Sequence, residues 1–307
     1  MESFQARGPF GAKSTAHDVV ADLDLKGKTI VLTGCNSGLG LETMKALTGR
    51  GAHVIGMARS LRSAQAACSL AGGSTTAMAC DLTDLNAVAR AANEILATGK
   101  PLDAIVANAG IAATPKLEAK YGVELQFLVN HVAHFLLITR LESAMRARTG
   151  RIVMVSSDAA IKQAPKVGIM FDNLDGHQMY KPFLFYGQSK LAVALCAREL
   201  ARRFTSRGIT VNFLHPGATG GTGLNRTLGF PLNLVLKVAR LFMKTAEQGA
   251  ATQTFLAASP MASDVTGEYW VDCQIAPEND KFRDDALAAR LWRVTQDIVD
   301  ENVTVAL

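Results

Sequence analysis

The chain has 307 residues, of which 49% are hydrophobic and 19% charged, so it is long enough for one large domain and too apolar to be disordered. Its formal net charge of +5 is small, and its basic residues are scattered, which argues against a nucleic-acid partner. The five cysteines form no C-x-x-C pair, so we expect reduced thiols and a cytoplasmic location. No apolar run reaches the roughly 18 residues of a membrane span, so no transmembrane segment is expected.

In chain order, residues 1–26 are rich in Gly, Ala and charged residues, which predicts a frayed N-terminal extension or surface arm. From 27 to 307, short β-rich runs alternate with helical patterns. The predicted strands are Thr29–Thr33, Ala52–Met57, Thr75–Cys80, Asp103–Ala107, Arg151–Ser156, Ile209–Leu214 and Glu268–Val271, and the predicted helices include Leu39–Arg50, Leu85–Thr98, Tyr121–Arg148 and Phe185–Ser206. Most strands are apolar throughout, so we expect one doubly wound Rossmann-type α/β domain with a seven-stranded, mostly parallel sheet and helices on both faces.

Two insertions interrupt the alternation, at residues 158–184 and 217–245. Each follows the carboxyl end of a strand, where open α/β sheets bind ligands, so each is a candidate substrate wall or lid. The second insertion contains the apolar stretch Leu232–Phe242. We expect this stretch to cover a lipophilic substrate or to join the core, in preference to a weak contact with a membrane surface.

A glycine-rich loop, Thr33-Gly34-Cys35-Asn36-Ser37-Gly38-Leu39-Gly40, joins the first strand to a helix. Glycines there permit a tight turn and the close approach of a pyrophosphate to the helix N-terminus, which predicts a dinucleotide site. The second strand ends in Ala58-Arg59, with no carboxylate for a ribose 2′-hydroxyl. A guanidinium suits a 2′-phosphate, so we expect NADP(H) in preference to NAD(H), with a plain surface arginine as the alternative.

Two further strand ends carry candidate cofactor contacts. Asp81, followed by Leu82, is placed to accept a hydrogen bond from an adenine amino group, and Asn108-Ala109-Gly110 predicts a ledge of small residues beneath the adenosine. A helix cap for Asp81 and a turn at Asn108 explain these residues equally well.

The pair Tyr186 and Lys190 opens a helical run, so the phenol and the ammonium lie one turn apart on one face. That spacing alone is weak evidence, but its place after the fifth strand, opposite the glycine loop, makes it a candidate proton-transfer pair. His131 and His134 have a spacing that could hold a metal. No further ligand is evident beside them, so no metal site is predicted.

These motifs, taken in order, resemble the short-chain dehydrogenase/reductase family. The shared elements are Thr33-Gly34-x-x-x-Gly38-x-Gly40, Asn108-Ala109-Gly110, Asn130, Ser156-Ser157, Tyr186-x-x-x-Lys190 and Pro216-Gly217. Three stretches resemble the retinol dehydrogenase and WW-domain oxidoreductase branch: Val129–Phe135, Gly267–Cys273 and Leu291–Val294. The long gap between Ser157 and Tyr186 is similar to that branch as well.

The resemblance implies a role for each matching residue. Tyr186 would exchange a proton with the substrate oxygen, Lys190 would hold the nicotinamide ribose and lower the pKa of Tyr186, and Ser157, in preference to Ser156, would hydrogen-bond the substrate oxygen. Asn130 would support a water that links Lys190 to solvent. Either of two threonines, Thr219 or Thr222, would contact the nicotinamide amide. The expected cofactor contacts are Gly34, Asn36, Ser37, Gly38, Leu39, Gly40, Arg59, Asp81, Leu82, Asn108, Ala109, Gly110, Tyr186, Lys190, Pro216, Gly217, Thr219 and Thr222.

The sequence and the resemblance together predict an NADP(H)-dependent oxidoreductase that interconverts an alcohol and its ketone or aldehyde. The apolar insertions favour a bulky lipophilic substrate of retinoid, steroid or aromatic type. Two alternatives are a carbon–carbon double-bond reductase on the same scaffold and a catalytically silent NADP-binding sensor. The family commonly forms homodimers through the helices predicted at Tyr121–Arg148 and Phe185–Ser206, although this branch need not.

Overall fold

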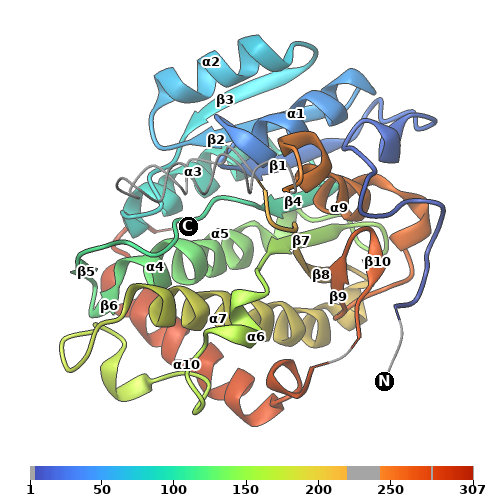
Figure 1. The fold of residues 1–307 in the computed structure, drawn as a ribbon. Helices are drawn as coiled ribbons and strands as arrows, with labels where there is room; N and C mark the ends of the chain where they lie inside the picture. The colour runs from blue at the N-terminus through green and yellow to red at the C-terminus, as the bar shows by residue number, and fades with distance from the viewer. Residues whose placement is uncertain (1–3, 220–242, 278, 307) are drawn as a thin grey trace, which may run out of the picture.

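A computed structural model describes residues 4–219, 243–277 and 279–306 of the chain. Its centre is an eight-stranded sheet in the order β10-β9-β8-β7-β4-β1-β2-β3 (Figure 1). All neighbouring strands are parallel except β9 and β10. The strands are β1 (Thr29–Thr33), β2 (His53–Ala58), β3 (Thr75–Ala79), β4 (Ala104–Ala107), β7 (Arg151–Val155), β8 (Thr210–His215), β9 (Tyr269–Val271) and β10 (Gln274–Ile275). The predicted doubly wound α/β fold is confirmed.

Helices cover both faces of the sheet (Figure 1). One face carries α1 (Gly38–Gly49), α2 (Leu61–Ala71) and α9 (Ala246–Ala258). The other face carries α3 (Leu85–Ala97), α5 (Ala133–Leu141), α7 (Pro182–Phe204) and α10 (Asp285–Asn302). In β1, Ile30 and Leu32 join the first core and Val31 joins the second, because successive side chains in a strand point to opposite faces. Burial on both faces explains why these strands are apolar from end to end.

The helix predicted at Tyr121–Arg148 is wrong at both ends. A hairpin of β5 (Ala119–Lys120) and β6 (Val123–Glu124) comes first, because Tyr121 and Gly122 adopt φ of +59° and +71°, which no α-helix accepts. Glu124 then caps a new helix by accepting hydrogen bonds from the backbone N–H groups of Gln126 and Phe127. The helix consists of α4 (Leu125–Phe127), the π-helical turn Leu128–Val132 and α5, and the short 3₁₀ helix Glu142–Ala144 follows it.

The sheet has one more strand than the seven predicted. β10 forms a hairpin with β9 through Asp272 and Cys273, which adopt φ of +57° and +61°. The turn was missed because neither position holds glycine, the residue that normally marks left-handed backbone. Among the described residues, the remaining short helices are Asp18–Val20, α6 (Ala159–Lys162), Phe171–Asn173, Thr205–Arg207, Pro260–Ala262 and Asp280–Phe282.

The N-terminal segment, residues 4–26, is packed against the sheet edge and α9, so the frayed alternative of the expected extension does not hold. Gln5 pairs antiparallel with Ile275 at the edge of the sheet, and the Phe10 ring lies 5.9 Å from the ring of Phe255 on α9. Val19 and Val20 are buried in the core beneath α9. The segment runs beside β10 in Figure 1. These contacts join the segment to residues far away in the chain, so local periodicity carried no signal of this docking.

The two insertions differ in how much the structure describes. In the first, Tyr180 donates to the carbonyl of Thr114 at 2.6 Å, which fastens the insertion to the loop after β4. In the second, only the two ends are described, and Lys244 there forms an ion pair with Asp272. The stretch Leu232–Phe242 lies outside the described residues, so its expected role as a lid or a membrane contact stays a prediction. In the described part of the chain, no helix combines the length and the hydropathy of a transmembrane span.

Candidate active site

A cleft of about 1020 Å³ opens at the carboxyl ends of the strands, over the neighbouring strands β1 and β4. The chain leaves β1 for the helix on one face and leaves β4 for the other face, and this divergence is where doubly wound sheets bind nucleotides. Predicted residues that line the cleft are Gly34, Asn36, Ser37, Gly38, Leu39, Gly40, Arg59, Asp81, Leu82, Asn108, Ala109, Gly110, Ser157, Tyr186, Lys190, Pro216, Gly217 and Thr219. Asn130 lies behind this lining, and Thr222 lies outside the described residues.

The glycine loop leaves room for a phosphate at the start of α1. Gly34 has φ of +68°, and a Cβ on Gly40 would lie 2.0 Å from the carbonyl oxygen of Gly34. Side chains are therefore excluded at both positions, and the loop packs directly against the first helical turn. The first backbone N–H groups of α1 have no acceptor within the helix, so they are available to an anion at the positive end of the helix dipole. These features fit the pyrophosphate of a dinucleotide.

Thr33 and Asn108 join the ends of β1 and β4. The Thr33 hydroxyl accepts hydrogen bonds from the backbone N–H groups of Asn108 and Ala109, each at 3.0 Å. The Asn108 side chain donates to the carbonyl of Thr33 at 2.8 Å and accepts from Gln253 at 3.0 Å. Asn108 thus fixes the floor of the cleft with its side chain, while Ala109 and Gly110 present the small surface that was predicted as a ledge.

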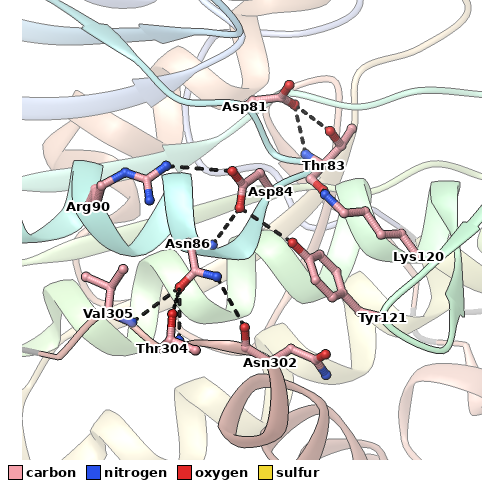
Figure 2. A network of polar contacts seen from close by, with 10 residues as sticks. All are labelled: Asp81, Thr83, Asp84, Asn86, Arg90, Lys120, Tyr121, Asn302, Thr304 and Val305. Atoms are coloured by element: carbon pink, nitrogen blue, oxygen red, sulfur yellow. Dashed lines mark hydrogen bonds and ion pairs between the residues drawn. The ribbon is translucent and has the colours of Figure 1, made fainter.

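A polar network supports the end of the cleft at which the adenine is expected (Figure 2). One oxygen of Asp81 accepts hydrogen bonds from both the backbone N–H and the hydroxyl of Thr83, each at 2.9 Å. Lys120, from the hairpin, donates to the Thr83 carbonyl at 2.8 Å. Asp84 caps α3, so the alternative reading of Asp81 as the helix cap does not hold.

Arg59 has no hydrogen bond or ion pair with any residue that the structure describes, and its exposed guanidinium lines the cleft directly after β2. Ala58, before it, is buried, and Ser60, after it, caps α2. A cation that has no partner among the described residues and lies in the same cleft as the glycine loop is available for an anionic ligand group.

Helix α7 carries the two residues of the predicted proton-transfer pair into the cleft. It starts at Pro182, whose fixed φ suits the first helical position. The Lys190 Nζ donates to the carbonyl of Val155 at 2.8 Å and lies 5.9 Å from the centre of the Tyr186 ring. Gly187 lets the helix approach α6, because a Cβ there would lie 2.5 Å from the backbone nitrogen of Ala164.

The two adjacent serines have different partners. Ser156 is 2% exposed and donates to the carbonyl of Lys190 at 2.7 Å, so its hydroxyl holds the backbone of α7 against β7. The Ser157 hydroxyl makes a long hydrogen bond of 3.3 Å to Asp158 and interacts with the Tyr186 phenol. Of the two hydroxyls, that of Ser157 is available to a substrate oxygen.

Burial dominates the electrostatics of Tyr186 and Lys190. It lowers the pKa of Lys190 to about 8 and raises the pKa of Tyr186, since both charged forms lose solvation. The contact with Ser157 acts against the rise at Tyr186, and the charge of Asp158 adds to it. The direction at Tyr186 is opposite to the lowering that the resemblance implied, because burial outweighs the favourable contact.

Asn130 holds the loop after β4 in place. Its side chain donates to the carbonyl of Ile111 and accepts from the backbone N–H of Ile111, both at 2.9 Å, and it donates to the Ser189 hydroxyl at 2.9 Å. The side-chain amide therefore has protein partners on both its oxygen and its nitrogen. Its expected support of a water beside Lys190 stays a prediction.

Asp158 and His215 are among the titratable residues of the cleft that the sequence patterns did not predict. Burial lowers the pKa of His215, while the charge of Asp158 raises it. The His215 Nδ1 is buried and has no hydrogen-bond partner among the described residues. Each residue directly adjoins a recognised motif, after Ser157 and before Pro216, and that adjacency was the available signal.

Comparisons with known proteins agree with this geometry. Residues 28–170 match the family model described as short chain dehydrogenase. The chain is 37% identical to human "Retinol dehydrogenase 14" over 298 residues, which cover 90% of this chain and 87% of that protein. It is 34% identical to "Short-chain dehydrogenase TIC 32 A, chloroplastic" of Brassica napus (95% and 94%) and 31% identical to human "WW domain-containing oxidoreductase" (97% and 74%).

Solved structures show the same fold. An uncharacterised protein of Mycobacterium paratuberculosis matches with a TM-score of 0.75 and 28% identity over 95% of this chain and 99% of that one. A dehydrogenase/reductase of Sinorhizobium meliloti matches with a TM-score of 0.62 and 27% identity over 80% and 93%. The predicted resemblance, including its branch, is thereby confirmed: the chain belongs to the short-chain dehydrogenase/reductase family of NAD(P)-dependent oxidoreductases.

Proposed function

We propose that the chain uses NADP(H) to interconvert an alcohol and its ketone or aldehyde, with Tyr186 as the group that exchanges a proton with the substrate oxygen. The observation that carries the proposal is that one cleft is lined by the glycine loop, Arg59, Ser157, Tyr186 and Lys190. The bound cofactor supplies or accepts the hydride. The Ser157 hydroxyl hydrogen-bonds the substrate oxygen, and the Lys190 ammonium favours the phenolate of Tyr186 when the proton leaves.

The lining of the cleft supports a lipophilic substrate. The loop after β4 and the helix that follows the hairpin contribute apolar side chains, among them Ile111, Leu125 and Val129. Retinol dehydrogenase 14, one of the similar proteins, is named for a bulky lipophilic alcohol. We therefore propose a substrate of retinoid, steroid or aromatic type.

The proton-transfer role is tested by Tyr186→Phe. Turnover of an alcohol and carbonyl panel, followed by nicotinamide absorbance, should fall by about 10²-fold or more, because the hydroxyl that moves the proton is lost. The dissociation constant for NADPH should stay within about twofold of wild type. Tyr121→Phe, outside the cleft, is the matched control and should retain turnover. Full activity of the Tyr186→Phe protein on its substrate would exclude this mechanism.

The cofactor preference is tested by Arg59→Ala. Charge-assisted hydrogen bonds to a 2′-phosphate contribute about 1.5–3 kcal/mol, so the Michaelis constant for NADPH should rise about 10- to 100-fold while that for NADH changes little. Arg62→Ala, on the neighbouring surface of α2, should leave both constants unchanged. Equal use of NADH and NADPH by the wild-type protein would overturn the preference for NADP(H).

A further inference from the structure

His134 lies on α5 behind the cleft and is 1% exposed. Its two ring nitrogens contact different parts of the site. The Nε2 atom lies 2.9 Å from the hydroxyl of Thr33 at the end of β1, and the Nδ1 atom lies 3.1 Å from the carbonyl oxygen of Asn130 in the π-helical turn. The imidazole thus spans the distance between the glycine loop and the segment that holds Asn130.

The partners determine the protonation of the ring. The Asn130 carbonyl can only accept, so Nδ1 must carry a hydrogen. Burial lowers the pKa of His134 to about 4, so the ring is neutral at physiological pH and Nε2 is an acceptor. The Thr33 hydroxyl already accepts from two backbone N–H groups, those of Asn108 and Ala109, and its one hydrogen is left to donate to Nε2. Every donor and acceptor in this chain of contacts is matched.

The network continues to Lys190 on the other side of Asn130. The Asn130 side chain bonds both backbone groups of Ile111 and donates to Ser189, the neighbour of Lys190. A Cβ on Gly110 would lie 3.1 Å from the Asn130 Oδ1 and 3.3 Å from the Lys190 Nζ. Thr33 therefore holds the loop after β4 at residues 108 and 109, Asn130 holds it at residue 111, and Lys190 packs against the glycine between them.

We propose that His134, as the neutral Nδ1–H tautomer, is a positioning residue. It links Thr33, which holds the loop at residues 108 and 109, to Asn130, which holds it at residue 111, and thereby fixes the loop against Lys190. The proposal rests on the proposed function for its kinetic readout only. His131, three residues earlier, is equally buried, but its Nε2 atom contacts Thr295 on α10 and not the end of β1. The two histidines therefore differ in what they hold.

The kinetic test compares His134→Phe with His131→Phe. Both substitutions keep an aromatic ring in a buried site and should lower the melting temperature to a similar extent. At saturating NADPH, His134→Phe should lower kcat on the order of tenfold, from the loss of two buried hydrogen bonds, and leave the substrate KM within about twofold. His131→Phe should keep the wild-type kcat. A wild-type kcat in folded His134→Phe would overturn the proposal.

A conservative variant separates positioning from packing. In His134→Asn, the side-chain amide can still donate near the Nδ1 position, so kcat should recover part of the loss seen in His134→Phe. This variant also keeps the test open if His134→Phe does not fold. Equal losses in the two variants would show that packing alone is responsible, which contradicts the proposal.

The tautomer itself is tested without turnover, by ¹⁵N-histidine NMR of the full chain between pH 6 and 8, with the His134 signals assigned by their loss in His134→Asn. We expect a proton on Nδ1 and an unprotonated Nε2 throughout. A proton on Nε2, or a charged ring, would overturn the proposal even if turnover is normal. If the wild-type protein reduces no carbonyl and oxidises no alcohol, the proposed function fails while this measurement still decides the role of His134.

Discussion

At the scale of single residues, the cleft places a cation where solvation is poor. Lys190 is 4% exposed, and the one hydrogen bond that its ammonium makes within the described residues is to the carbonyl of Val155. A carbonyl dipole compensates only part of the solvation that the charge loses, which is why the pKa of Lys190 falls to about 8. The site therefore holds a poorly solvated ammonium, which stabilises a nearby anion such as a phenolate on Tyr186.

This shift makes the stability of the protein depend on pH. The folded pKa of about 8 lies below the unfolded value of 10.5, so the unfolded chain binds more protons between these values and the free energy of unfolding rises with pH. From pH 7 to 9.5, below the titration of ordinary tyrosines, the gain from this group should be about 2 kcal/mol. Urea unfolding of wild type and Lys190→Met over this range measures it, and parallel pH profiles of the two proteins would contradict the expectation.

Sequence patterns located residues that line the cleft but not their local partners. The order of the motifs was enough to place Ser157, Tyr186 and Lys190 in one cleft. The same patterns could not predict that Ser156 bonds the Lys190 carbonyl or that Asn108 bonds Thr33, since both contacts join residues far apart in the chain. The pKa direction of Tyr186 was mispredicted for the same reason, because burial depends on the packing of the whole cleft.

At the scale of elements, helices were predictable where one amphipathic pattern ran without a break. The span 121–148 failed at its start because Tyr121 adopts a positive φ, which its residue type does not signal, and at its end because the chain becomes extended at Met145 after the 3₁₀ helix Glu142–Ala144. The π-helical turn at Leu128–Val132 lies within the same span and includes Asn130. Such turns commonly occur at functional sites, where they change the direction of side chains along a helix.

The approach of α6 to α7 depends on Gly187. In Gly187→Ala, the new Cβ would lie 2.5 Å from the Ala164 nitrogen and from the Gln163 carbonyl carbon, and backbone atoms cannot move aside as a flexible side chain would. We expect a loss of about 2–4 kcal/mol in the free energy of unfolding, together with lower turnover, because Tyr186 is displaced.

Gly49→Ala on α1 is the matched control for Gly187→Ala. Gly49 has nothing within 4 Å of an added Cβ, so alanine should stabilise the helix by about 0.5–1 kcal/mol. Chemical unfolding of both variants gives the comparison. A Gly187→Ala protein as stable as wild type would mean that α6 and α7 are not in close contact.

At the scale of the whole molecule, the strands were predictable because burial on both faces requires nearly continuous apolar runs. The doubly wound topology followed from the alternation of strands and helices, and the position of the cleft followed from the topology. Docking of residues 4–26 was not predictable, since it depends on the surface that the sheet edge and α9 offer only after folding. The N-terminal segment is thus a non-local contribution to the fold.

Removal of this segment tests how much it contributes. A chain without residues 1–21 loses the buried side chains of Ala16, Val19 and Val20, and it exposes the core beneath α9. Since each fully buried valine contributes about 1.5–3 kcal/mol, the free energy of unfolding should fall by at least about 3 kcal/mol. Hydrogen exchange should accelerate in α9 and at Ile275, whose N–H donates to Gln5, more than in α3 on the opposite face. His17→Ala, an exposed change in the same segment, should leave stability unchanged. Wild-type stability and exchange in the shortened chain would instead identify residues 4–21 as a passive surface arm.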